Sequence, residues 1–226
     1  MNLHLRKLSK KKVRVVAMQR ASKVSKLLLG INAVTLSPRK PYKFVSGVLS
    51  PVYCDNRLIL SYPEKRNIIV NAFIETIKAK KLKFEIIAGV ATSGIPFATL
   101  LADRLKMPMV YVRSDVKKHG KQNVVEGRLE KGKKVLLVED LISTGKSSIA
   151  AVQALRNNGA VVNDCIAIFT YNFKIAKDNF KANKCNLHVL SDFENLIEVA
   201  AKEGYIKKAD LGMVLSWNQN PEVLGK

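Results

Sequence analysis

The sequence has few cysteines and no long apolar run. Its three cysteines, Cys54, Cys165 and Cys185, are widely spaced and form no CxxC pair or Cys/His cluster. This argues against a disulfide framework and a cysteine-based metal site, and it favours a reduced, cytoplasmic protein. No apolar run reaches the roughly 20 residues that span a bilayer. No apolar stretch follows the basic start in the manner of a secretory signal. We therefore expect no membrane partner.

Acidic residues are also scarce, and none precedes Asp55. The chain has 39 Lys and Arg against 18 Asp and Glu, a formal net charge of +21. Such an excess suits nucleic acid, an anionic membrane surface or anionic small substrates, but solvated lysines explain it most simply. We interpret residues 1–20 as a basic, solvated extension, with disorder, a transit peptide or a nucleic-acid arm as other interpretations. A nucleic-acid partner is not expected.

The length of 226 residues suits one medium domain with a small added lobe. From Ala21 apolar residues recur at helical spacing, and two short strands with a turn follow between residues 46 and 60. After Pro63 the chain alternates between helices and short apolar strands, which predicts an α/β fold with a mostly parallel central sheet flanked by helices. We expect residues 21–62 to form an N-terminal helix and a small lobe, and residues 63–226 the core. The expected strands are 86–90, 109–112, 135–138, 165–171 and 187–190, and the expected helices between them include 95–105 and 147–157.

One segment combines a strand, a pair of acids and a small-residue loop. The strand 135–138 is followed by Glu139 and Asp140, then by the loop 143–147, and a helix begins there. Hydroxyl residues and glycine let backbone N–H groups converge on a phosphate at a helix N-terminus. Two carboxylates beside a phosphate would repel it, so they are expected to hold hydroxyls or a metal ion of the same ligand. A phosphorylated sugar has both features.

A nucleotide-binding Walker A loop is the obvious rival, because Gly145, Lys146 and Ser147 match the end of its GxxxxGK[ST] pattern. That pattern requires glycine where the chain has Asp140. A plain capped helix after a strand would explain the serines and the glycine, but not the neighbouring acid pair.

The eleven residues VEDLISTGKSS, from Val138 to Ser148, resemble the 5-phosphoribosyl-1-pyrophosphate (PRPP) signature of the type I phosphoribosyltransferases. The resemblance implies their α/β fold, with Glu139 and Asp140 on the ribose hydroxyls and the loop around the 5-phosphate. Lys146 departs from the glycine or small residue that is common there. The PRPP-binding residues that it implies in this segment are Glu139, Asp140, Leu141, Ile142, Ser143, Thr144, Gly145, Lys146 and Ser147.

The segment YVRSDVKKHGKQNVVEG, from Tyr111 to Gly127, resembles the mobile catalytic loop of the orotate phosphoribosyltransferase family. The resemblance assigns Arg113, Lys117 and His119 to PRPP and to catalysis at its pyrophosphate. Cations aimed at a leaving pyrophosphate stabilise the charge that develops in the transition state. A solvated lysine pair and a surface histidine are the plain alternatives.

Two further segments extend the resemblance. AGVATSGIP, residues 88–96, resembles the family's pyrophosphate-side loop, and SPVYCDNR, residues 50–57, resembles the hood over its base. The second implies orotate binding by Tyr53, and Ser143 is expected to contact orotate as well. Leu49 stands where many relatives have lysine.

The resemblance implies an enzyme that converts orotate and PRPP to orotidine 5'-phosphate and pyrophosphate, in de novo pyrimidine (UMP) biosynthesis. It implies Mg²⁺ bound through PRPP without direct protein ligands, and a homodimer with shared active sites. Two alternatives stay open: a purine phosphoribosyltransferase, and a non-catalytic RNA-binding regulator of the same fold.

Overall fold

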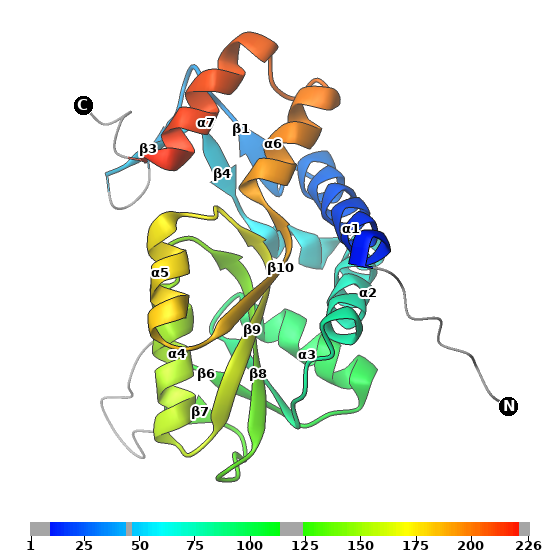
Figure 1. The fold of residues 1–226 in the computed structure, drawn as a ribbon, viewed down its shortest axis with the longest axis vertical. Helices are drawn as coiled ribbons and strands as arrows, with labels where there is room; N and C mark the ends of the chain where they lie inside the picture. Colours follow the sequence, from blue (N-terminus) through cyan, green and yellow to red (C-terminus); the bar gives the residue numbers. More distant parts are fainter. Residues whose placement is uncertain (1–9, 44–46, 114–123, 222–226) are drawn as a thin grey trace, which may run out of the picture.

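The computed structural model describes residues 10–43, 47–113 and 124–221. Within these ranges helices and strands alternate after residue 80 (Figure 1). The elements are α1 (Lys10–Gly30), β1 (Val34–Leu36), β2 (Tyr42–Lys43), β3 (Leu49–Ser50), β4 (Val52–Cys54), the 3-10 helix η1 (Asn56–Ser61), α2 (Pro63–Lys80), β5 (Ile86–Val90), α3 (Gly94–Leu105), β6 (Met109–Val112), β7 (Val125–Glu126), β8 (Lys134–Ile142), α4 (Lys146–Asn157), β9 (Val161–Thr170), α5 (Lys174–Ala182), β10 (Asn186–Asp192), α6 (Phe193–Lys202), the 3-10 helix η2 (Lys208–Asp210) and α7 (Leu211–Gln219).

The central sheet has the strand order β10-β9-β8-β5-β6-β7. Every neighbouring pair is parallel except β6 with β7, which is antiparallel. The mostly parallel sheet expected from the sequence is therefore confirmed. Strand β5 has β6 on one side and β8 on the other, so the strand order reverses between β5 and β8. Ligands of open α/β sheets bind at such a point, beyond the carboxyl ends of the strands.

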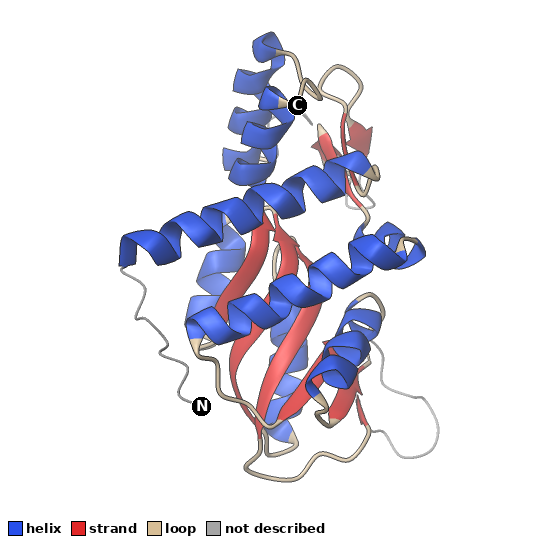
Figure 2. Cartoon of the chain, turned by 90° about the vertical axis from the view of Figure 1, so that its right-hand side faces the viewer, coloured by secondary structure: helices blue, strands red, loops and turns tan. Residues whose placement is uncertain are grey.

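Helices cover both faces of this sheet. Helices α1, α2 and α3 pack on one face, where Leu28, Phe73 and Phe97 are fully buried. Helices α4 and α5 pack on the other, with Val152 and Phe180 in a second cluster. Figure 2 shows α1 and α2 lying side by side across the sheet. Because both faces are covered, the strands are apolar without alternation, as the sequence pattern indicated.

Above the sheet lies a small lobe that we call the hood, strands β1 to β4 with η1 (Figure 1). It consists of two separate antiparallel pairs, β1 with β4 and β2 with β3. Helix α7 closes on it, since the indole N–H of Trp217 donates to the carbonyl of Leu49 at 2.8 Å. Leu49 thus contributes its backbone to the hood's attachment.

Three elements differ from the sequence expectation. Helix α1 begins at Lys10, so the second half of the predicted extension 1–20 is helical. Strand β8 continues to Ile142 and includes the acid pair, which the sequence had placed in a loop. The two-residue edge strand β7 falls in a stretch that was expected to be a long connection.

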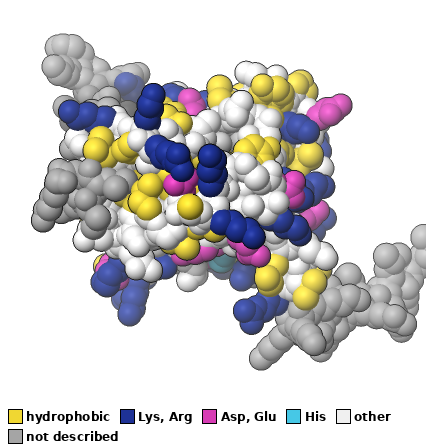
Figure 3. Space-filling model, turned by 90° about the horizontal axis from the view of Figure 1, so that it is seen from above, with side chains coloured by type: hydrophobic (Ala, Val, Ile, Leu, Met, Phe, Trp, Pro, Cys, Tyr) yellow, Lys and Arg dark blue, Asp and Glu magenta, His cyan; other side chains and the backbone are white. Residues whose placement is uncertain are grey.

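Lysines and arginines are spread over the surface. On the face in Figure 3 they are separated by apolar, neutral and acidic side chains. This distribution agrees with solvated lysines rather than one basic patch on that face. Within the described residues, no helix combines the length and apolar character that crossing a membrane requires.

Candidate functional site

The acid pair lies at the carboxyl end of the central strand β8. Glu139 and Asp140 are only 5% and 9% exposed. One carboxylate oxygen of Glu139 accepts from the backbone N–H of Asp140 at 3.1 Å, and the other accepts from the hydroxyl of Ser148 at 3.4 Å. Hydrogen bonds therefore fix a pair of carboxylates that burial alone would disfavour.

Burial raises the pKa of the Glu139 carboxyl well above its usual range, and the neighbouring Asp140 charge raises it further. Burial also raises the pKa of Asp140, but hydrogen bonds and the nearby Arg57 charge oppose that effect. The two carboxyls titrate as a pair. Burial is thus the main cause of the raised pKa at both carboxyls, and their mutual repulsion adds to it at Glu139.

The turn after β8, which was predicted to bind a phosphate, is shaped by a glycine and held by helix α5. Gly145 has a φ of 77°, in the left-handed region that glycine adopts without cost. A Cβ added there would lie 3.1 Å from the ring of Phe180. The side chain of Asn179 donates to the carbonyl of Thr144 at 2.9 Å. Helix α5 thereby holds the turn, and helix α4 begins at Lys146, whose side chain is exposed.

The loop from β5 to α3 faces the acid pair. It contains Ala91, Thr92 and Ser93, with a cis peptide bond between the first two. A Cβ added to Gly94 would lie 2.6 Å from the carbonyl oxygen of Val138. Glycine is therefore required here so that α3 can approach strand β8.

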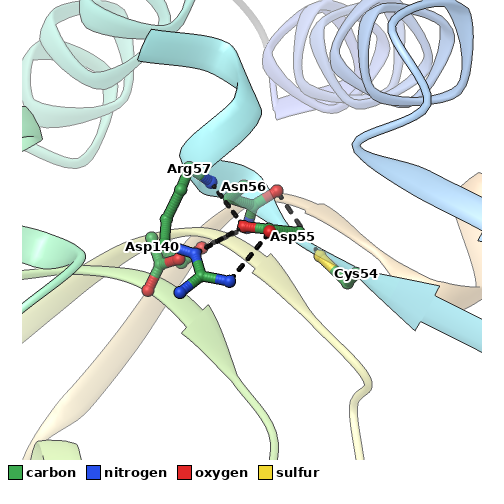
Figure 4. Close-up of polar contacts among 5 residues, drawn as sticks. All are labelled: Cys54, Asp55, Asn56, Arg57 and Asp140. Atoms are coloured by element: carbon green, nitrogen blue, oxygen red, sulfur yellow. Dashed lines mark hydrogen bonds and ion pairs between the residues drawn. The ribbon is translucent and has the colours of Figure 1, made fainter.

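The third wall comes from the hood (Figure 4). The side-chain amide of Asn56 donates to the backbone carbonyl of Asp140 at 2.8 Å, and Asn56 itself is fully buried. Asp55 accepts from Arg57 Nε at 2.7 Å and from Nη2 at 2.8 Å. Sequence reasoning quoted this segment for Tyr53 alone and missed Asn56 and Arg57. A polar run directly after a strand was the available signal.

The end of β8, the loop before α3 and the hood line a pocket of about 250 Å³ that is open to solvent. Four residues expected to bind PRPP line it: Glu139, Asp140, Leu141 and Ser147. Ser143, Thr144, Gly145 and Lys146 are on the adjoining turn, and Ile142 is fully buried with its carbonyl accepting from Thr170. The remaining lining residues are Cys54, Asp55, Arg57, Ala91, Thr92 and Ser93.

Tyr53 and Arg113, two further predicted residues, do not line this pocket. Tyr53 is 42% exposed, and its ring centroid is 5.5 Å from that of Tyr42. Arg113 follows β6 and forms an ion pair with Glu126 at 3.4 Å. Lys117 and His119 lie outside the described residues. In the part of the chain that is described, no cluster of three or more His, Cys, Asp or Glu side chains could hold a metal ion.

The fold and the site can be compared with known proteins. The model of the phosphoribosyl transferase domain family matches residues 61–203. An orotate phosphoribosyltransferase of Coxiella burnetii is 55% identical over 205 residues, which are 91% of this chain and 98% of that protein. One of Cytophaga hutchinsonii is 47% identical over 204 residues, 90% and 98% of the two chains. The crystal structure of orotate phosphoribosyltransferase from Aeropyrum pernix superposes with a TM-score of 0.71 at 28% identity, covering 81% of this chain and 99% of that one.

The parallel sheet, the acid pair and the glycine turn at the head of α4 define a phosphoribosyltransferase, a class of pentosyl-transferring enzymes. Within that class the chain belongs to the orotate phosphoribosyltransferase family.

Proposed function

We propose that the chain transfers the 5-phosphoribosyl group of PRPP to orotate, giving orotidine 5'-phosphate and pyrophosphate in de novo UMP synthesis. One observation carries this proposal: the buried pair Glu139–Asp140 shares a pocket with Ser147, at the head of a phosphate-type turn. A sugar phosphate needs hydroxyl acceptors and phosphate donors a few ångströms apart, and this strand–turn–helix supplies both.

PRPP is oriented by the residues of β8 and the turn after it. The carboxylates of Glu139 and Asp140 accept the ribose 2- and 3-hydroxyls, while the segment 143–147 wraps the 5-phosphate. The ribose C1 then faces the loop 91–93 on one side and the hood on the other. Holding C1 next to the attacking nitrogen of orotate makes the reaction effectively unimolecular, which is the entropic contribution to catalysis.

In the reaction the orotate nitrogen attacks C1 and the bond from C1 to the pyrophosphate oxygen breaks. The electron pair of that bond leaves on pyrophosphate. Orotate that has lost its nitrogen-bound proton to solvent before binding needs no general base. Arg113, Lys117 and His119 are assigned to the leaving pyrophosphate, because cations at that point stabilise the charge that grows in the transition state.

A Mg²⁺ ion bound through PRPP would need no direct protein ligand. Glu139 and Asp140 line the described site and are carboxylates of the kind that would suit such an ion, and the described residues hold no larger cluster of metal-ligating side chains. Bound in this way, Mg²⁺ would neutralise part of the pyrophosphate charge.

The hood is assigned to the base. Tyr53 and Ser143 are expected to contact orotate, Tyr53 with its ring and Ser143 with its hydroxyl or backbone. The exposure of Tyr53 in the hood supports this role, since its ring is accessible to a ligand. A homodimer with shared active sites and a cytoplasmic location complete the proposal; three free cysteines, all buried, suit a reducing compartment.

A direct test follows the loss of orotate absorbance in the presence of PRPP and Mg²⁺. Turnover with orotate is expected. Turnover with a purine base but not with orotate would contradict the proposal, and so would the absence of turnover with every base tested. The substitution Lys117→Ala tests the pyrophosphate assignment. It should lower kcat by about 100-fold while PRPP affinity and the fold persist, and an unchanged kcat would show that Lys117 has no catalytic role.

A further inference from the structure

Arg57 occupies a defined position in the pocket without an assigned role. Among the described residues that line this pocket, it is the cationic one. The orientation of its guanidinium plane is fixed because the carboxylate of Asp55 accepts hydrogen bonds from both Nε and Nη2. The side chain is nevertheless 62% exposed, so the pair with Asp55 does not bury it. An arginine held by one carboxylate and open to a pocket is preorganised for a second anion.

The segment that carries Arg57 is anchored on three sides. Asp55 donates its backbone N–H to the carbonyl of Ala33 at 2.7 Å, and its side chain caps η1 by accepting from the backbone N–H of Arg57 at 3.1 Å. Asn56 is tied to strand β8 through the carbonyl of Asp140. The thiol of Cys54 donates to the Asn56 side chain at 3.4 Å. The guanidinium therefore has a fixed place relative to the acid pair (Figure 4).

The pocket is electrostatically divided. Glu139 and Asp140 form its anionic wall, whereas Arg57 comes from the hood and Thr92 and Ser93 come from the loop before α3. A ligand that fits must present hydroxyls to the carboxylates and an anion to the guanidinium and the two hydroxyl residues. PRPP has this arrangement, since its ribose hydroxyls and its pyrophosphate lie on neighbouring carbons of one ring.

We propose that Arg57 is a further catalytic residue of this site, which donates from its guanidinium to the pyrophosphate of PRPP opposite Thr92 and Ser93. This proposal rests on the proposed function and deepens it. Arg57 belongs to the described, anchored wall of the pocket and would hold the leaving group before and during the breaking of the bond to C1. Asp55 is then a positioning residue that fixes the plane of the guanidinium.

The main competing ligand for Arg57 is the carboxylate of orotate, because the hood is expected to cover the base. The presence of Thr92 and Ser93 in the same pocket favours phosphate oxygens. The two ligands can be separated by experiment: pyrophosphate has no base, and orotidine 5'-phosphate has no pyrophosphate.

The test measures binding of inorganic pyrophosphate with Mg²⁺, and separately of orotidine 5'-phosphate, by isothermal titration calorimetry on the full chain. Arg57→Met should weaken pyrophosphate binding by about tenfold to a hundredfold, the loss of one charge-assisted hydrogen bond. Arg57→Lys should recover part of the pyrophosphate binding, since the positive charge remains but the planar guanidinium with its paired N–H donors is lost. Arg128→Met is the matched control: Arg128 also pairs with a carboxylate, that of Glu130, and its side chain is 89% exposed outside the pocket.

Each outcome of these titrations either supports or overturns the assignment of Arg57 to pyrophosphate. Weaker pyrophosphate binding in Arg57→Met, with unchanged orotidine 5'-phosphate binding, supports the proposal and also shows that the variant is folded. Unchanged pyrophosphate binding overturns it, and a loss confined to orotidine 5'-phosphate overturns it in favour of the base. If the unmodified chain does not convert orotate but binds pyrophosphate through Arg57, the proposed function fails and the assignment of Arg57 is supported.

Discussion

The phosphate side and the hood side of the pocket are built in different ways. Strand β8, which carries the acid pair, is nine residues long; β5 pairs with it from Val135 to Val138, and β9 pairs with it from Lys134 to Ile142. The hood strands have two or three residues each and are paired on one side only. Hydrogen bonds from Trp217 to Leu49 and from Asn56 to Asp140 attach the hood to the rest, and its buried side chains Val52 and Ile59 belong to the main core cluster.

This difference separates two tasks. The sugar phosphate is assigned to a long strand that β9 pairs from Lys134 to Ile142, so its geometry can be precise. The base is assigned to a lobe of two- and three-residue strands, each paired on one side only, which is expected to open more easily than the sheet. A phosphoribosyltransferase core can therefore keep one PRPP site while the lobe above it varies.

The largest effect is expected where the phosphate side has no free space. Gly94→Ala would set a Cβ 2.6 Å from the carbonyl oxygen of Val138 and 3.4 Å from the Cα of Glu139. Both neighbours are backbone, so α3 must move away from β8, at a cost of about 1–3 kcal/mol in unfolding free energy. Because the shift displaces Glu139, kcat/KM for PRPP should fall by about 100-fold. Urea unfolding and initial-rate kinetics measure the two effects.

The control for this substitution is Gly212→Ala in α7, where a Cβ would meet nothing within 4 Å. It should leave kinetics unchanged and stability unchanged or raised by up to about 1 kcal/mol. Equal losses in both variants would show that glycine replacement, not the contact with β8, is responsible.

The acid pair should make the free enzyme less stable as pH rises. Burial raises the pKa of Glu139 in the folded state, so the folded state binds more protons than the unfolded one above the usual carboxyl range. Stability from this group is thus present below that range and is lost as pH rises through the raised pKa. Glu139→Gln should be as stable as the unmodified chain at about pH 4 and more stable at about pH 8, while losing activity. Urea midpoints without PRPP measure this; a variant less stable at both pH values would contradict it.

The parts of the site that consist of consecutive residues were predictable from the sequence. The turn from Ser143 to Ser147 follows an apolar strand in sequence, and the structure has that strand and that turn. The end of the strand was not predictable, since Glu139 and Asp140 are buried although neither is apolar, and the apolar pattern stops at Val138. Asn56 was missed because its partner is 84 positions away.

In the fold, too, the elements with a continuous sequence pattern were predictable and the others were not. The apolar strands of the sheet were predicted within a few residues, because burial on both faces leaves a continuous signal. Helix α1 was expected to begin at Ala21, since the side chains described before it are exposed or half-buried and carry no apolar periodicity. Strand β7 has two residues, too few for any pattern.

A smaller and more selective effect is expected on the hood side. Trp217→Phe keeps a buried ring but removes the N–H that donates to Leu49. The cost should be about 0.5–1.5 kcal/mol, that of one hydrogen bond. Since this contact attaches the hood, KM for orotate should rise while PRPP affinity stays the same. Steady-state kinetics and PRPP titration test the separation, and a parallel loss of PRPP affinity would mean that the two sides are not independent.

The smallest effect is expected from removing residues 1–20. The side chains described from Arg14 to Arg20 are exposed or half-buried, and the first buried apolar residues of α1 are Ala21 and Val24. The shortened chain should keep kcat, KM for orotate and PRPP affinity, because none of the residues described before Ala21 lines the pocket. Removing residues 1–30 instead would take away Leu28, which is fully buried against the sheet, and should abolish folding. If the chain lacking residues 1–20 were inactive, α1 would have to support the site along its whole length, and the boundary between extension and fold would move to the start of the helix.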